Sequence, residues 1–158
     1  MRIYHIFIEL NLILNQFGKI SAATYKNYIN ASLKTKKIKE AELFLETYKD
    51  FLIDDLKEET YNFNKACLYF EKRMYDEVIK TLLSTKQNDI YYNIAQRRLL
   101  LKTYYEMMLK NKSYYNVLIS GMDSFKKFIS IKNTIPEADV IINKAFLKNL
   151  NNTLIYQK

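Results

Sequence analysis

Residues 60–83 read TYNFNKACLYFEKRMYDEVIKTLL, and this stretch decides the fold class. A small residue, Ala66, is followed by the aromatic residues Tyr69 and Phe70, then by a short polar turn and a second apolar segment. On both sides of the turn, apolar residues recur at the spacing of one helix face. Small residues let two helices approach closely, and aromatic rings fill the space where they diverge. The stretch therefore predicts two helices joined by a tight turn.

The pattern recurs along the chain. Second helices of a pair open at Ile38, then 37 residues later at Tyr75, and about 40 residues further on at Tyr114, which is the spacing of two-helix repeats. The first two openings are followed three residues later by Ala41 and Val78. We expect about eight helices, over residues 2–17, 21–36, 38–53, 56–73, 75–86, 90–111, 114–131 and 135–156. Candidate caps are Ser21 and Asp89 at helix starts and Gly18 at the end of the first helix.

These elements predict an all-α fold, a right-handed solenoid of antiparallel helix pairs in one domain of residues 1–158. Residues 1–18 and 135–156 would form capping helices around about three helix pairs in residues 21–131. Composition agrees, because the chain has two glycines and one proline, too few for the turns of a sheet protein. The apolar share of 49% excludes intrinsic disorder.

The stretch at residues 60–83 resembles a tetratricopeptide repeat. Further segments resemble uncharacterised repeat proteins of Bacteroidetes, in which such repeats form the C-terminal part of a longer chain. These segments are residues 21–27, 61–66, 89–93 and 99–106, followed by Asp123-Ser-Phe125. The resemblance covers about residues 18–150. It implies the helical-repeat fold and a scaffold whose concave groove binds an extended peptide or a partner helix, but no assigned activity.

In tetratricopeptide repeats, the first helix of each pair lines the concave groove. Counting back from the second helices predicts seven groove residues: Lys26, Asn30, Lys34, Asn64, Glu71, Arg98 and Lys102. The order of lysine, asparagines and basic residues resembles the clamp by which some of these domains bind the terminal carboxylate of a peptide. The third repeat departs from that pattern, because strict counting places Ala95 and Leu99 at its basic positions. The expected partner is a protein or peptide of acidic character.

The net charge of +8, from 25 basic and 17 acidic residues, leaves a nucleic-acid-binding helical-repeat module as the alternative function. Arg97, Arg98 and Lys102 lie among tyrosines that stack on bases in single-strand binders. The tyrosines form three pairs, 91/92, 104/105 and 114/115. We favour a structural role for them, with one member of each pair facing the core, and therefore favour the protein partner over nucleic acid.

The apolar segment of residues 3–14 is too short to span a bilayer and contains Glu9. We interpret it as a buried first helix, and therefore expect a cytoplasmic protein without a membrane span. A secreted or periplasmic location is the alternative, in which the segment is a signal peptide. Ile6 and Phe7 on this helix are candidate contacts for a third function, self-assembly into a homo-oligomer or a larger complex.

Catalytic chemistry is not predicted. The only histidine is His5 and the only cysteine is Cys67, so neither a zinc site nor a nucleophile–base pair can be nominated. Two isolated glycines cannot form a phosphate-binding loop. Cys67 lies in a predicted helix and is interpreted as a structural thiol. We therefore expect no enzymatic activity, no cofactor and no metal.

Overall fold

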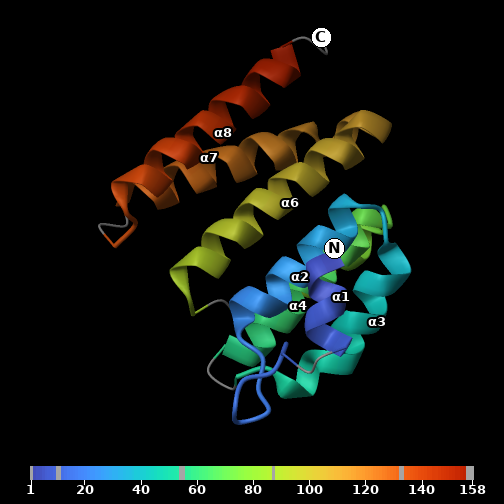
Figure 1. Ribbon diagram of the computed structural model, residues 1–158. Helices are drawn as coiled ribbons and strands as arrows, with labels where there is room; N and C mark the ends of the chain where they lie inside the picture. The colour runs from blue at the N-terminus through green and yellow to red at the C-terminus, as the bar shows by residue number, and fades with distance from the viewer. Residues whose placement is uncertain (1, 10–11, 54–55, 87, 132–133, 156–158) are drawn as a thin grey trace. The chain divides into compact units, whose positions relative to one another are not determined.

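The structure, a computed structural model, describes residues 2–9, 12–53, 56–86, 88–131 and 134–155, with side chains from residue 6 onward (Figure 1). Over these residues the chain is all-helical, as predicted, with eight α-helices and a single isolated bridge between Ile20 and Leu52. The helices are α1 (Arg2–Glu9), α2 (Ala22–Lys34), α3 (Ile38–Tyr48), α4 (Lys57–Glu71), α5 (Tyr75–Ser84), α6 (Ile90–Lys110), α7 (Tyr115–Ile131) and α8 (Glu137–Ile155). Short 3-10 turns, η1 (Lys49–Phe51) and η3 (Lys112–Tyr114), follow α3 and precede α7. None of the described helices combines the length and the apolar composition that crossing a membrane requires.

The first helix is shorter than the sequence predicted. We expected it over residues 2–17, but α1 ends at Glu9. A turn follows, in which Asn15 Oδ1 accepts hydrogen bonds from the amides two and four residues later, at 2.9 and 3.0 Å. Gly18 adopts a φ of 69° in this turn, a conformation that suits glycine, so it does not cap a helix as predicted. An asparagine that bonds nearby backbone competes with helix formation, which the apolar pattern of the segment did not reveal.

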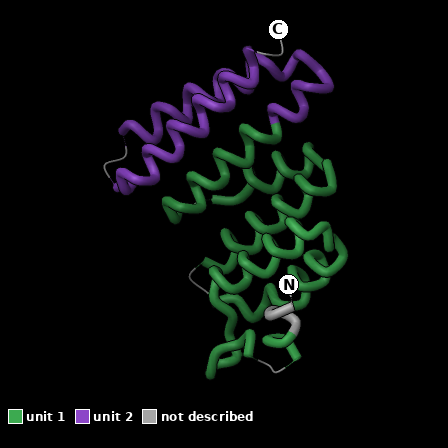
Figure 2. Tube along the Cα trace, turned by 45° about the horizontal axis from the view of Figure 1, so that its top comes forward, with its two compact units in different colours: residues 1–103 green, residues 104–158 purple. Residues whose placement is uncertain are grey.

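The chain divides into two compact units, residues 1–103 and 104–158, coloured separately in Figure 2. The boundary falls inside α6, so this helix contributes to both units. The sequence predicted one repeat domain of residues 1–158.

In the first unit, α2 packs on α3 and α4 packs on α5, and α4 also contacts both α2 and α3. The turn that joins α2 to α3 and the turn that joins α4 to α5 have the same geometry, and they lie 37 residues apart. Lys36 and Arg73 both have a φ of 59°. The next amide in each turn, of Lys37 or Met74, donates to the carbonyl five residues earlier at 2.9 Å. This bond, together with the left-handed residue, is a Schellman-type helix end.

A left-handed turn residue that is not glycine is a point where the protein can be stabilised. Arg73 is exposed, and its Cβ makes the positive φ unfavourable by about 1 kcal/mol compared with glycine. We expect Arg73→Gly to raise the melting temperature, followed by circular dichroism, by about 2–4 °C. Arg73→Ala is the matched control and should give no such gain, because it removes the charge but keeps the Cβ. Equal stabilisation by both substitutions would contradict the prediction.

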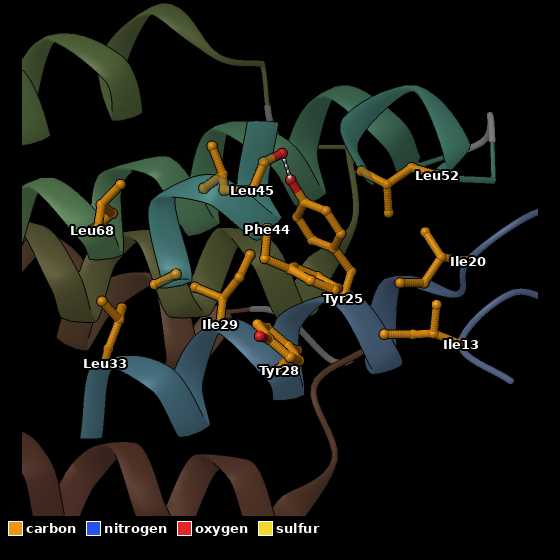
Figure 3. Close-up of a cluster of buried hydrophobic side chains, with 11 residues drawn as sticks. Ile13, Ile20, Tyr25, Tyr28, Ile29, Leu33, Phe44, Leu45, Leu52 and Leu68 are labelled. Atoms are coloured by element: carbon orange, nitrogen blue, oxygen red, sulfur yellow. Dashed lines mark hydrogen bonds between the residues drawn. The ribbon is translucent and has the colours of Figure 1, made fainter. Parts of the chain in front are cut away.

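The main core of the first unit lies between α2, α3 and the segments that flank them (Figure 3). Tyr25 is fully buried, and its hydroxyl donates a 2.6 Å hydrogen bond to the carbonyl of Leu45. The rings of Tyr28 and Phe44 stack with their centroids 3.8 Å apart. Ile20 belongs to the same cluster, and its amide donates to the carbonyl of Phe51 at 2.8 Å, so the segment before α2 is tied to η1.

A second core cluster joins α4 and α5 to the first part of α6. Its buried members are Ala66, Val78, Leu82 and Leu99. The side-chain amide of Gln96 donates to the carbonyl of Leu82 at 2.5 Å, which ties α6 to α5. Ala41 and Val78, the small and branched residues of the two openings, both have no exposed surface. Each therefore lies where a second helix meets its neighbours, as the repeat pattern predicted.

The second unit contains the end of α6, η3, α7 and α8, with α7 packed on α8. The buried apolar residues of the two helices are Leu118, Phe125 and Ile129 on α7 and Leu147, Leu150 and Leu154 on α8. These spacings of three, four and seven residues form one stripe on each helix. The last helix begins at Glu137, two residues later than predicted.

Candidate functional site

The strongest candidate site is a pocket of about 280 Å³ in the first unit, here called the α2/α4/α6 pocket. Three helices that alternate along the chain contribute to it. It is lined by Ala22, Ala23 and Lys26 of α2, by Leu56 just before α4 and Phe63 in α4, and by Asp89 just before α6 and Tyr91, Tyr92 and Ala95 in α6. Three of these side chains are alanines, which leave room between neighbouring helices. Two aromatic walls and one cation surround that room.

The aromatic walls are fixed by contacts between α4 and α6. The rings of Phe63 and Tyr92 meet edge to face, with centroids 5.7 Å apart. The Tyr92 hydroxyl and Thr60 Oγ1 are hydrogen-bonded at 2.8 Å, and burial raises the pKa of Tyr92, so this hydroxyl stays protonated at neutral pH. Tyr91 is 59% exposed. For this tyrosine pair, the prediction that one member faces inward is confirmed.

Two carboxylates hold the start of α6 in place. Glu59 is buried on α4, and its oxygens accept hydrogen bonds from the amides of Asn88 (2.8 Å) and Asp89 (3.2 Å). Asp89 Oδ1 accepts from the next amides, of Tyr91 (2.8 Å) and Tyr92 (3.0 Å), which confirms it as a cap. The first amides of a helix have no partner within the helix, and negative charge there is favourable. These bonds set the position of both tyrosines at the pocket.

The start of α2, whose first residues also line the pocket, is capped by a side chain as well. Ser21 Oγ accepts a hydrogen bond from the amide of Thr24 at 3.1 Å, which confirms the predicted cap. Ala22, Ala23 and Lys26 follow within the first turns of the helix. The cap fixes the start of α2, and therefore the position of Lys26 in the lining of the pocket.

Charges also gather around Cys67, one turn along α4 from Phe63. Burial raises the pKa of the Cys67 thiol to about 12, while the nearby cations Lys102 and Lys26 act to lower it and Glu71 acts to raise it. The thiol is therefore neutral at physiological pH, which agrees with a structural role. These three charged residues, Lys26, Glu71 and Lys102, come from three different helices.

Most of the predicted groove residues lie on this part of the first unit. Lys26 lines the pocket, and Asn30 and Lys34 follow it at successive turns of α2, half-buried and exposed respectively. Glu71 forms an ion pair with Lys36 at 2.9 Å. Lys102 is exposed near Cys67. Arg98 is half-buried and already interacts with other groups of the chain.

Asn64 is the exception. It has no exposed surface, and its Nδ2 donates to the carbonyl of Thr60 at 2.7 Å, so in this conformation its amide cannot contact a ligand. Counting by the 37-residue spacing of the two turns leads from Lys26 to Phe63 and from Asn30 to Cys67. The position equivalent to Lys26 in α4 is therefore Phe63, one residue before the predicted Asn64, and Phe63 lines the pocket. Phe63, Tyr91 and Ala95 are pocket residues that sequence reasoning did not nominate.

The remaining residues that the sequence singled out lie on α1 and α6. Ile6 on α1 is 42% exposed, whereas Phe7 is half-buried. Their role in self-association stays a prediction. The side chain of His5 lies outside the described part of the chain. Arg97 is half-buried and its Nε donates to Asn93 Oδ1 at 3.0 Å; a role in binding nucleic acid stays a prediction.

Comparison of the chain with protein-family models, with curated proteins and with solved structures found no match to any of them.

Proposed function

We propose that this protein is a binding scaffold that holds an extended acidic peptide or a partner helix along α2, α4 and α6. In this proposal the helix pairs form a right-handed solenoid of the tetratricopeptide kind, and the chain has no catalytic role. The observation that most supports the proposal is the α2/α4/α6 pocket. Its walls come from the first helix of each proposed pair, which is where such a scaffold binds its ligand.

The repeat itself is supported by backbone geometry. The helix ends at Lys36 and Arg73 have the same φ and equivalent hydrogen bonds, 37 residues apart. Equivalent turns join the two helices of each pair in the same way, and in the proposed stack of such pairs the first helices form one continuous face. Lys26 and Phe63 are equivalent positions on that face, and both line the pocket.

The chemistry of the face suits a ligand with an apolar side chain beside negative charge. Ala22, Ala23 and Ala95 leave space for the side chain, and Phe63 provides an apolar wall. Lys26 and Lys102 are exposed cations that attract a carboxylate, and Asn30 on the next turn of α2 offers amide donors. The clamp for a terminal carboxylate keeps Lys26, Asn30 and Lys102 in this proposal but loses Asn64, which is buried.

Charge reversal on the exposed lysines tests this function without disturbing the core. Binding of fluorescent acidic peptides, with free or amidated C-termini, is measured by anisotropy for the wild type, Lys26→Glu and Lys102→Glu. We expect each substitution to weaken binding by roughly tenfold, since the reversed charge repels the peptide. Lys39→Glu on α3 is the matched control, because it changes an exposed lysine outside the pocket by the same charge.

The control separates a groove from a diffuse basic surface. Equal weakening by Lys39→Glu and Lys26→Glu would contradict the proposal. A titration with a single-stranded oligonucleotide tests the alternative function: binding that is tighter than that of any peptide and falls steeply between about 50 and 200 mM salt would indicate a nucleic-acid-binding module instead. A peptide whose affinity falls on amidation would further identify the terminal carboxylate as the group recognised.

A further inference from the structure

The second unit contains a hollow of its own, between α7 and α8, with a volume of about 400 Å³. We call it the α7/α8 hollow. Lys126 of α7 and Lys144 and Lys148 of α8 all line it. Lys144 and Lys148 are one helical turn apart and therefore lie on the same face of α8. Three lysines from two helices thus line one small space.

The lysines outnumber the carboxylates that line the hollow by three to one. None of the three takes part in an ion pair with a described carboxylate, and all three are exposed. The surrounding sequence adds to the excess, since residues 104–158 contain eight lysines and only four acidic residues. Like charges held close together repel one another, and an anion placed between them relieves that repulsion. The hollow is therefore set up to attract negative charge.

The rest of the lining limits what kind of anion fits. Met122 is half-buried and Leu147 is 8% exposed, so the hollow has an apolar floor. Asn151 adds an amide, and Asp123 is the single carboxylate. No aromatic side chain is among the described residues that line it, so it lacks the stacking surface on which single-stranded nucleic acids bind. Its volume is in the range of small-molecule sites.

We propose that the α7/α8 hollow binds a short polyphosphate chain, either free or as the phosphate tail of a nucleotide. Lysine is a common phosphate ligand that acts as a point charge, and three lysines match the several charges of such a chain. A ligand with one charge would leave most of the repulsion in place. The inference does not depend on the proposed peptide scaffold, because all the residues involved lie in the second unit.

Calorimetric titration of the full chain with sodium tripolyphosphate and, separately, with ATP tests the proposal. At about 150 mM salt, where diffuse surface charge is largely screened, we expect saturable binding of tripolyphosphate at one site. Lys144→Gln and Lys148→Gln should each weaken it by roughly tenfold, because each removes one phosphate contact. Lys127→Gln is the matched control, since Lys127 is exposed on α7, next to Lys126, and does not line the hollow. Thermal melts of all variants should coincide, as these lysines are exposed.

The two probes distinguish the two sources of phosphate. Equal affinities would show that the phosphate chain alone is recognised, and tighter binding of ATP would show that the nucleoside adds contacts, with Met122→Ala reducing that gain. Absence of saturable binding of either probe up to about 1 mM would overturn the proposal. So would a loss with Lys127→Gln as large as that with Lys148→Gln. An oligonucleotide that binds more tightly than tripolyphosphate and is unaffected by the hollow variants would overturn it too, by showing an extended surface elsewhere.

Discussion

Replacing Tyr25 with alanine is expected to lower the free energy of unfolding by about 3–5 kcal/mol, the typical loss for deleting a buried aromatic ring. Tyr25 has no exposed surface, and its ring lies 5.6 Å from that of Phe44, centroid to centroid. Truncation would leave a cavity between α2 and α3 and would remove the donor that bonds the Leu45 carbonyl at 2.6 Å. A small protein is stable by only about 5–15 kcal/mol, so this loss is a large share of the total. Urea denaturation followed by circular dichroism measures it.

Two control variants separate the contributions of the ring and the hydroxyl. Tyr25→Phe keeps the ring and removes only the donor to the Leu45 carbonyl, so we expect a loss of about 1 kcal/mol. Tyr91→Ala removes a ring that is 59% exposed, and should change stability by less than about 1 kcal/mol. If Tyr25→Ala were no more harmful than Tyr91→Ala, the packing of α2 on α3 described here would be wrong.

The second large effect is expected at Glu59. Its buried carboxylate accepts the amides of Asn88 and Asp89, so Glu59→Ala would leave two amides at the start of α6 without acceptors. We expect a loss of about 2–3 kcal/mol, because hydrogen bonds to a charged group are among the stronger ones and the site is shielded from water. Chemical denaturation gives the change in stability, and hydrogen exchange should show earlier opening of the amides at the start of α6.

The neighbouring Glu58 provides the control for this effect. It has the same charge and lies in the same first turn of α4, but it is exposed. Glu58→Ala should therefore cost less than about 0.5 kcal/mol. Equal losses at the two positions would mean that charge near the helix start matters and the contact with α6 does not. Glu59 holds Asp89, whose side chain bonds the amides of Tyr91 and Tyr92, so its loss should weaken peptide binding at the α2/α4/α6 pocket as well.

Much of the fold was predictable because it depends on short-range chemistry. The caps Ser21 and Asp89 bond amides two or three residues away, and the left-handed turns at Lys36 and Arg73 are closed by bonds of three to five residues. Such interactions depend on neighbours in the chain, so a pattern of residues is enough to place them. The exception was α1, where the side chain of Asn15 formed a turn that apolar periodicity alone does not indicate.

The pocket contains one of the residues that the sequence nominated for the groove. Lys26 is exposed on α2 and lines the pocket, and its role in binding stays a prediction. Asn64 was placed on the same kind of face of α4 but is buried. Consecutive residues of a helix differ by about 100° in direction, so an error of one position exchanges a pocket residue, Phe63, for an interior one.

The sequence by itself determined the all-helical class, the approximate ends of most helices and the 37-residue spacing between the starts of α3 and α5, because each depends on contacts between residues a few positions apart. Only the tertiary structure decided which face of α4 is enclosed, since that depends on α6 and on the bond between Thr60 and Tyr92, 32 residues apart. It also decided that residues of α2, α4 and α6 line one pocket, and that three lysines of α7 and α8 line one hollow. Contacts between distant segments form only where packing brings helices together, and packing is a property of the whole fold.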